Sequence, residues 1–205
     1  MIGIIDYGMS NLTSVKNALD YLNIESEISD SPDKFEQYDR LILPGVGAFG
    51  LAMEHINQKG FAEALKLHVL NQRKPLLGIC LGMQLFLDAS EEFGFHQGLG
   101  LIKGTVKYFG NQIKGLSVPH VGWNTVEIKK QSSLLDDSVT VNDYSFYFVH
   151  GYYCDVADKE AISGLTDYGI KFVSAIEKEN IFAVQFHPEK SQKYGLAIFK
   201  KFAEI

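Results

Sequence analysis

Hydrophobic and polar positions in the first half of the chain alternate between short apolar runs and stretches with helical spacing. Ile2–Ile5 predicts a buried strand, and the leucine and valine positions from Leu12 to Leu22 recur every three or four residues, which predicts an amphipathic helix. Further strands are predicted at Glu25–Ser29, Arg40–Leu43 and Leu76–Ile79, and further helices at Phe61–Leu70, before Pro75, and at Leu81–Ala89. Alternation of this kind predicts a parallel sheet with helices on both faces.

From about Leu101 the pattern changes to short runs rich in β-branched and aromatic residues, which predict strands with few helices between them. These strands are expected at Thr105–Phe109, Thr125–Ile128, Ser145–Val149, Lys171–Ile176 and Ile181–Phe186, before a closing helix at Tyr194–Phe202. No Ser- or Pro-rich linker and no repeat separates the two halves. The sequence therefore predicts one domain over residues 1–205.

Composition narrows the classes of function. The 205 residues are 46% hydrophobic and 21% charged, as in ordinary globular proteins, and the net charge is -6. Lys and Arg never cluster beyond a pair such as Lys129-Lys130, so nucleic-acid binding has no electrostatic basis. The start of the chain lacks the features of a signal peptide, and the most apolar run, Leu76–Leu87, is shorter than the roughly 20 residues of a membrane span. A cytoplasmic location is expected.

The two cysteines differ in their surroundings, and their spacing predicts neither a disulfide framework nor a zinc site. Gly78-Ile-Cys80-Leu-Gly82 fits a nucleophile elbow, the sharp strand-to-helix turn that exposes a reactive side chain at the carboxyl edge of a sheet. The start of a helix also favours the thiolate form. A buried inert thiol is the competing interpretation of Cys80, and it is the favoured one for Cys154.

A thiol nucleophile needs a base and a group that orients the base, and His187-Pro188-Glu189 offers both. Pro188 favours an extended conformation at His187, so the side chains of His187 and Glu189 are expected on the same side. The strand that precedes them ends where open α/β sheets keep their sites. Surface or core roles are favoured for His55, His68 and His96, and structural or interface roles for His120 and His150.

The segment Leu43-Pro-Gly-Val-Gly47 predicts a tight loop after the third strand. Its glycines allow backbone N–H groups to turn inward, so Val46 and Gly47, together with the N–H of Leu81, are candidates for an oxyanion hole. An ordinary turn is the alternative interpretation of this segment.

Three segments together, Pro44-Gly-Val-Gly47, Gly78-Ile-Cys-Leu-Gly-Met-Gln84 and Gln185-Phe-His-Pro-Glu-Lys190, resemble class I glutamine amidotransferases. Ile5-Asp-Tyr-Gly-Met-Ser-Asn-Leu12, Pro119-His-Val-Gly-Trp-Asn124 and Tyr147-Phe-Val-His150 narrow the likeness to the glutaminase subunits of imidazole glycerol phosphate synthases, from histidine biosynthesis. The resemblance implies an α/β fold with a mostly parallel central sheet flanked by helices and additional antiparallel strands in the second half.

The resemblance also implies an activity. It suggests a γ-glutamyl thioester on Cys80, glutamate and ammonia as products, and no cofactor or metal. The ammonia would pass to a (β/α)₈ barrel cyclase held in a heterodimer, which would form imidazole glycerol phosphate and AICAR. Carried over by motif, glutamine would contact Gly47, Gln84, Gly151 and Tyr152, and the cyclase would contact Asn11, Trp123, Tyr147 and Lys190.

Three residues depart from the family pattern: Ser10 replaces a usual glycine, Thr13 an arginine, and Gly151 a hydroxyl residue. They leave open a paralogous glutaminase that feeds another synthase, such as one that makes amidino groups on bacterial surface sugars. Two further alternatives are a free-standing Cys hydrolase or peptidase and a non-catalytic subunit that only scaffolds its partner.

Overall fold

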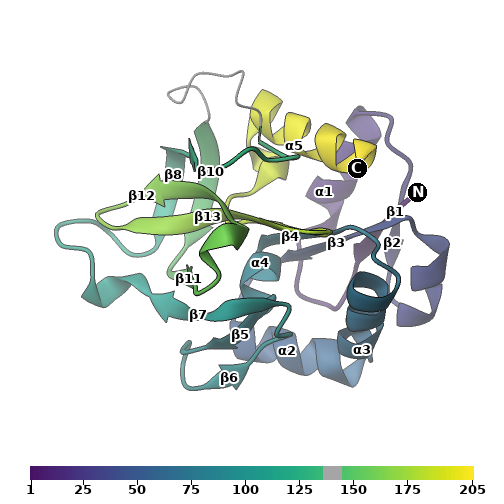
Figure 1. Cartoon of the computed structure of the whole chain (residues 1–205), viewed down its shortest axis with the longest axis horizontal. Helices are drawn as coiled ribbons and strands as arrows, with labels where there is room; N and C mark the ends of the chain where they lie inside the picture. The colour runs from purple at the N-terminus through teal and green to yellow at the C-terminus, as the bar shows by residue number, and fades with distance from the viewer. Residues whose placement is uncertain (136–144) are drawn as a thin grey trace.

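The computed structural model describes residues 1–135 and 145–205 and contains a central sheet with helices on both faces (Figure 1). The elements of its first half are β1 (Ile2–Ile5), α1 (Leu12–Tyr21), β2 (Ser26–Ser29), a 3₁₀ helix (Pro32–Gln37), β3 (Arg40–Gly45), α2 (Phe49–Gln58), α3 (Phe61–Lys66), a π-helix (Leu67–Asn71), β4 (Leu76–Cys80), α4 (Leu81–Leu85), β5 (Leu87–Ser90) and β6 (His96–Gln97).

The second half is richer in strands, as its β-branched and aromatic runs predict. Its elements are β7 (Ile102–Tyr108), η3 (Phe109–Asn111), β8 (His120–Thr125), β9 (Glu127–Ile128), β10 (Ser145–His150), β11 (Tyr152–Val156), η4 (Lys159–Ala161), β12 (Ile162–Asp167), β13 (Lys171–Lys178), β14 (Ile181–Val184), η5 (Pro188–Lys190) and α5 (Gln192–Glu204).

Twelve strands form one mixed sheet that runs through both halves, in the order β2-β1-β3-β4-β14-β13-β11-β7-β5-β6, with β12 and β9 branching from β13. The five strands from β2 to β14 are parallel, whereas β14, β13, β11 and β7 pair antiparallel. β8 and β10 form a separate antiparallel pair. The predicted α/β class, with a parallel core and added antiparallel strands, is therefore confirmed.

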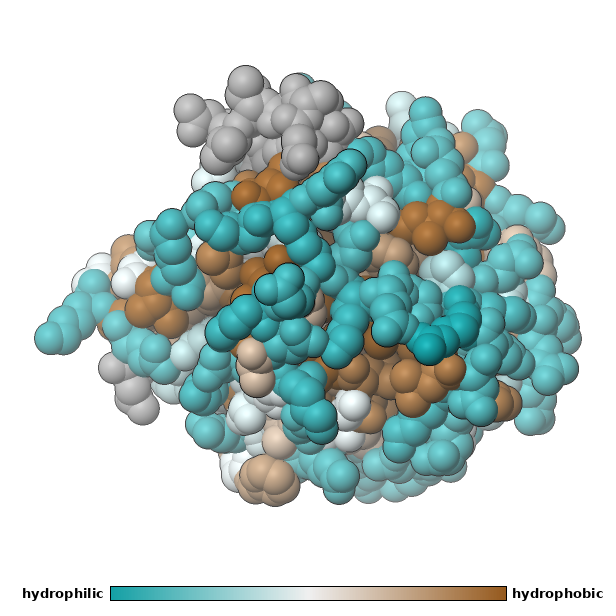
Figure 2. Space-filling model, viewed as in Figure 1, coloured by the Kyte–Doolittle hydropathy of each residue, from teal (hydrophilic) through white to brown (hydrophobic). Residues whose placement is uncertain are grey.

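Two apolar layers cover the faces of the parallel strands. In one layer α1 and α5 pack against the sheet through side chains such as Leu19 and Phe199. In the other layer α2 and α3 pack against it through side chains such as Ile56 and Leu65. In Figure 1 these helix pairs lie above and below the sheet. Figure 2 shows mainly hydrophilic residues on the viewed surface, with hydrophobic side chains in the depressions between them.

Several predicted boundaries are wrong. The helix predicted at Leu81–Ala89 ends at Leu85, because Leu87–Ser90 pairs with β7 as strand β5. Apart from the partly exposed Asp88 the run is buried, so it offers too few exposed polar positions for its period to be read. The helix predicted at Phe61–Leu70 becomes a π-helix after Lys66, and the strand predicted at Thr125–Ile128 is divided between β8 and β9. Helix α2 is not predicted at all.

Candidate active site

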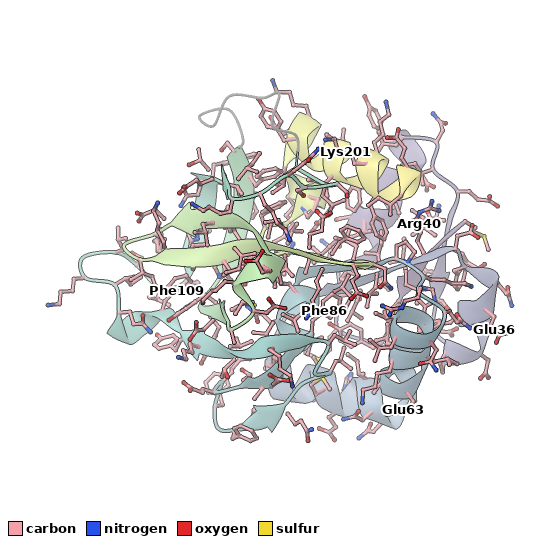
Figure 3. The ribbon with its side chains drawn as sticks, in the orientation of Figure 1. Glu36, Arg40, Glu63, Phe86, Phe109 and Lys201 are labelled. Carbon is pink, nitrogen blue, oxygen red and sulfur yellow. The ribbon has the colours of Figure 1, made fainter. Side chains whose placement is uncertain are left out.

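The Cys80 elbow lies at the carboxyl end of β4, between the parallel strands β3 and β14. Cys80 has a positive φ of 54°, a conformation that non-glycine residues rarely adopt and that is typical of a strained nucleophile turn. A Cβ at Gly82 would lie 1.8 Å from the Leu43 carbonyl oxygen, and a Cβ at Gly78 would lie 2.8 Å from the ring of Phe86, which is labelled in Figure 3. The two glycines therefore allow the turn to pack against β3 and against the chain that follows it.

His187 and Glu189 lie just beyond β14, the other strand beside β4. His187 has an extended backbone with φ -100° and ψ 98°, as Pro188 predicts, and its Nδ1 lies 2.7 Å from Glu189 Oε1. Both side chains are 2% exposed. The other ring nitrogen of His187, Nε2, has no hydrogen-bond partner among the described residues. It is the atom left to act on a group in the pocket.

The charges around His187 change its protonation. Burial alone lowers the pKa of the imidazole, but the charge of Cys80 and the hydrogen bond and charge of Glu189 outweigh burial and raise the pKa to about 10. At neutral pH the imidazole is therefore protonated and can form an ion pair with a thiolate at Cys80. This arrangement resembles the activated thiol–histidine pair of nucleophilic cysteines.

The backbone of His187 is tied to β10 by Ser191. His187 N donates to the Tyr147 carbonyl at 2.9 Å, Tyr147 N donates to Ser191 Oγ at 2.9 Å, and Ser191 Oγ donates to the His187 carbonyl at 2.6 Å. Ser191 is fully buried. The position of the imidazole therefore depends on the two-stranded β8–β10 sheet as well as on β14.

A pocket of about 310 Å³ opens beside Cys80 and His187. All six residues predicted for substrate or oxyanion contacts line it: Val46, Gly47, Leu81, Gln84, Gly151 and Tyr152. Its other lining residues are Glu92, Pro119, Val149 and His150. The structure thus brings together residues from segments that are distant in the sequence.

The loop that was predicted to supply oxyanion donors lies beside Cys80, but Pro44 and Gly45 still belong to β3. Gly47 has a φ of 102°, which favours glycine. The Val46 N–H donates to the Met9 carbonyl at 3.0 Å, so it is occupied in this conformation. Leu81 is the first residue of α4, where a backbone N–H has no partner within the helix. Of the predicted donors, Leu81 is the one whose N–H lies at the N-terminus of a helix.

Glu92 is a pocket residue that the sequence analysis missed. Its Oε2 accepts a hydrogen bond from Phe49 N at 2.5 Å, at the first turn of α2, so the carboxylate caps that helix while it lines the pocket. Among the described residues that line the pocket it is the one carboxylate. It is the second residue of the pair Glu91-Glu92, which no motif surrounds, so the sequence offers no signal that separates it from an ordinary surface acid.

His120 and His150 form a second missed feature, a buried hydrogen-bonded pair. His120 Nδ1 lies 3.2 Å from His150 Nε2, and His150 Nδ1 lies 2.8 Å from the Tyr152 carbonyl, which accepts only. His150 therefore donates from Nδ1 and accepts from His120. Burial lowers the pKa of His120 to about 4 and that of His150 to about 3, so both rings are neutral. Asn124 Nδ2 lies 3.4 Å from the remaining nitrogen of His120.

The three remaining histidines have the surface or core placements that the sequence favours, with one difference. His68 is buried and His96 lies on β6, but His55 on α2 has a polar partner, since its Nδ1 lies 3.1 Å from the Tyr7 carbonyl. Cys154 is 1% exposed in the core, and burial raises the pKa of its thiol, so it is inert.

Three of the four residues predicted to contact a partner form one exposed group. Trp123 on β8 and Tyr147 on β10 are cross-strand neighbours with rings 6.2 Å apart, and Lys190 Nζ lies 5.7 Å from the Tyr147 ring. Half of the Trp123 surface is exposed. Asn11 lies at the exposed N-terminal end of α1, a helix that contacts η5.

No helix in the described part of the chain is long and apolar enough to cross a membrane. Within the same residues, no group of three or more His, Cys, Asp or Glu side chains is placed to hold a metal ion.

Comparison with known proteins identifies the same family as the three motifs. Residues 3–205 match the family model described as glutamine amidotransferase class-I. The chain is 49% identical over its whole length to the complete imidazole glycerol phosphate synthase subunit HisH of Chlorobaculum tepidum, and 46% identical, also over both whole chains, to subunit HisH 1 of Campylobacter jejuni.

Solved structures confirm the fold. A structure titled PurLQS from Thermotoga maritima covers 99% of this chain and 97% of its own with a TM-score of 0.77 at 17% identity. A structure titled glutamine amidotransferase gives a TM-score of 0.74 at 17% identity, with the same coverage of both chains.

Proposed function

Because the chain belongs to the class I glutamine amidotransferase family, we propose that it is the glutaminase subunit of an imidazole glycerol phosphate synthase, which hydrolyses L-glutamine to L-glutamate and ammonia for histidine biosynthesis. The observation that carries the proposal is that Cys80 and His187 meet at one pocket, with Glu189 bonded to His187, and that Gly47, Gln84, Gly151 and Tyr152 line the same pocket. The identity to the HisH relatives over the whole chain supports the choice of pathway.

The chemistry follows from the ion pair. The Cys80 thiolate attacks the side-chain carbonyl carbon of glutamine, and the new S–C bond leaves negative charge on the carbonyl oxygen. His187 gives its proton to the amide nitrogen, the C–N bond breaks, and ammonia leaves a γ-glutamyl thioester. Water then loses a proton to His187 and attacks the thioester, which releases glutamate and restores the thiolate. Glu189 holds the imidazole in orientation and stabilises its charge.

The oxyanion needs N–H donors that are not all available in this conformation. Leu81 N–H can face the oxygen from the end of α4, but Val46 N–H is bonded to Met9. A full oxyanion hole would require the Gly45–Val46 peptide to turn toward the pocket. The loop that would turn contacts Met9, two residues before Asn11, so binding of a partner at that end of α1 would favour the turned form.

The partner surface is assigned by motif and exposure. We propose that Trp123, Tyr147, Lys190 and Asn11 bind a (β/α)₈ barrel cyclase subunit, as in the family, with Trp123 as the aromatic anchor. The Ser191 bonds then give that surface a short physical connection to the His187 backbone. The proposed subunit acts in the cytoplasm, where the ammonia passes directly to the cyclase.

Glutamate and ammonia release from glutamine, measured with and without the cyclase subunit of an imidazole glycerol phosphate synthase, tests the proposal. We expect slow turnover alone and at least tenfold faster turnover in the complex, and Cys80→Ala should lower turnover in the complex by about 10⁴-fold or more. Retained turnover in Cys80→Ala would exclude the thioester mechanism. Equal turnover with and without the cyclase would exclude only the coupling.

A further inference from the structure

A buried pair of amide side chains, Gln84 and Gln185, connects the pocket wall to the Cys80 sulfur. Gln185 directly follows β14, is fully buried, and places its Nε2 3.7 Å from Cys80 Sγ. Its Oε1 accepts a hydrogen bond from Gln84 Nε2 at 3.1 Å. The same Gln84 nitrogen donates to the Tyr152 carbonyl at 3.1 Å. The two amides thus form a continuous path from the pocket floor to the sulfur.

The direction of these hydrogen bonds is determined by the Tyr152 carbonyl, because a carbonyl oxygen only accepts. The NH₂ group of Gln84 must face it, and the second hydrogen of that group then points to Gln185. An acceptor is needed there, so the Gln185 oxygen faces Gln84 and its NH₂ group faces Cys80. The amide orientation at the sulfur is therefore fixed by a residue that does not touch the sulfur.

One other neighbour of the sulfur, the Val149 carbonyl, favours the neutral thiol instead of the thiolate. The Val149 carbonyl lies 3.9 Å from Cys80 Sγ and can only accept a proton from a thiol. The Gln185 NH₂ group can only donate, and so it stabilises a thiolate. Since Cys80 is 6% exposed, water cannot replace this donor well. Gln185 is thus the neutral group beside the sulfur that favours its reactive form.

We propose that Gln185 is a positioning residue of the glutaminase: it donates a hydrogen bond to the Cys80 thiolate, fixes the position of the sulfur, and depends on Gln84 for its own orientation. This role of Gln185 rests on the proposed function in one respect, namely that the thiolate reacts with glutamine. The hydrogen bond itself belongs to the protein without substrate.

The pH dependence of Cys80 alkylation by iodoacetamide tests it, with peptide mass analysis to separate Cys80 from Cys154. Gln185→Met keeps the length of the side chain and removes the donor, so the alkylation midpoint should move upward by roughly one pH unit. Gln185→Glu keeps the shape but places a negative charge beside the sulfur, so its midpoint should move further. In glutaminase assays both variants should lose at least about tenfold in kcat.

Ser174→Ala is the matched control, because it removes a buried hydrogen bond of 2.9 Å between Ser174 and Thr166 on neighbouring strands and leaves Cys80 untouched. Its midpoint should equal that of the wild type. Folded Gln185 variants, as judged by their Tm, with unchanged midpoints would overturn the proposal. If neither variant folds, Gln84→Leu provides the same measurement, because it frees the Gln185 amide to rotate.

Alkylation does not use glutamine, so the two proposals fail separately. Shifted midpoints in a protein that never releases ammonia would overturn the proposed function and support the role of Gln185. If the wild type releases ammonia and all variants have the same alkylation midpoint, the proposed function is supported and the role of Gln185 is overturned.

Discussion

The two sides of the pocket are built in different ways. On the parallel side, the position of Cys80 follows from sterics: β4 lies between β3 and β14, and glycines at 78 and 82 let the turn pack against its neighbours. On the antiparallel side, the pocket floor at Gly151 and Tyr152 is held by polar groups, chiefly the His120–His150 pair and Gln84. The nucleophile therefore depends on close backbone approach, and the floor depends on directed hydrogen bonds.

This difference gives the two sides different tolerance to change. Backbone packing at the elbow cannot relax, because the neighbouring atom is a carbonyl oxygen of a central strand. The polar floor can lose one member and keep its shape, since the Tyr152 carbonyl accepts hydrogen bonds from both His150 and Gln84. Substitutions on the two sides test this contrast directly.

Gly82→Ala should have the largest effect. A Cβ 1.8 Å from the Leu43 oxygen would force β3 and α4 apart, so the free energy of unfolding should fall by about 3 kcal/mol and glutaminase activity should be lost. Chemical denaturation and the glutaminase assay measure the two effects. Gly164→Ala on β12 is the control from the antiparallel half, where a Cβ would lie 2.7 Å from a Val126 methyl and 3.1 Å from the Ala175 Cβ, with no backbone oxygen among its nearest atoms.

Because a side chain can move where a carbonyl cannot, Gly164→Ala should cost less, about 1 kcal/mol, and keep activity. If the two alanine variants are equally stable and active, the elbow does not need its glycine, and the contrast between the halves is wrong.

The same contrast explains how much the sequence could predict. The elbow and the strand before His187 are local patterns, so the sequence places Cys80 and His187 each just beyond a strand, where open α/β sheets keep their sites. The extended backbone of His187 also agrees with local reasoning. The resemblance then named pocket residues that local patterns alone do not identify.

What could not be predicted arises from distant contacts. Glu92 enters the pocket only because β5 replaces the second half of a predicted helix and brings the loop after it against the start of α2. The pairing of His120 with His150 depends on the register of β8 and β10, which the local residue pattern does not determine. The contact of Gln185 with Cys80 depends on the same kind of tertiary placement.

Glu92→Gln should have an intermediate effect, expressed in binding. We propose that its carboxylate binds the α-ammonium group of glutamine, so loss of the charge should raise KM about 30-fold and change kcat less than threefold. Stability should fall by about 1 kcal/mol, because the charge also caps α2. Steady-state kinetics and denaturation separate the two effects.

Glu91→Gln is the matched control, since Glu91 is the exposed neighbour and should leave KM unchanged. A glutamine analogue that lacks the α-amino group sharpens the test further. The wild type should use it poorly, and Glu92→Gln should use it no worse than the wild type does. If Glu92→Gln lowers kcat/KM equally for glutamine and for the analogue, Glu92 acts only through the position of α2.

Gly151→Ser should have the smallest effect, although it lies in the pocket floor. A Cβ there would meet only ordinary contacts, 3.6 Å to Val118 and 4.0 Å to Pro119, and the backbone is not left-handed, so the floor has room for the hydroxyl residue usual in the family. We expect a free energy of unfolding within about 0.5 kcal/mol of the wild type and a KM for glutamine up to threefold lower, through one added hydrogen bond. Denaturation and steady-state kinetics measure both. A tenfold loss of kcat/KM would show that the polar floor tolerates change as poorly as the elbow does.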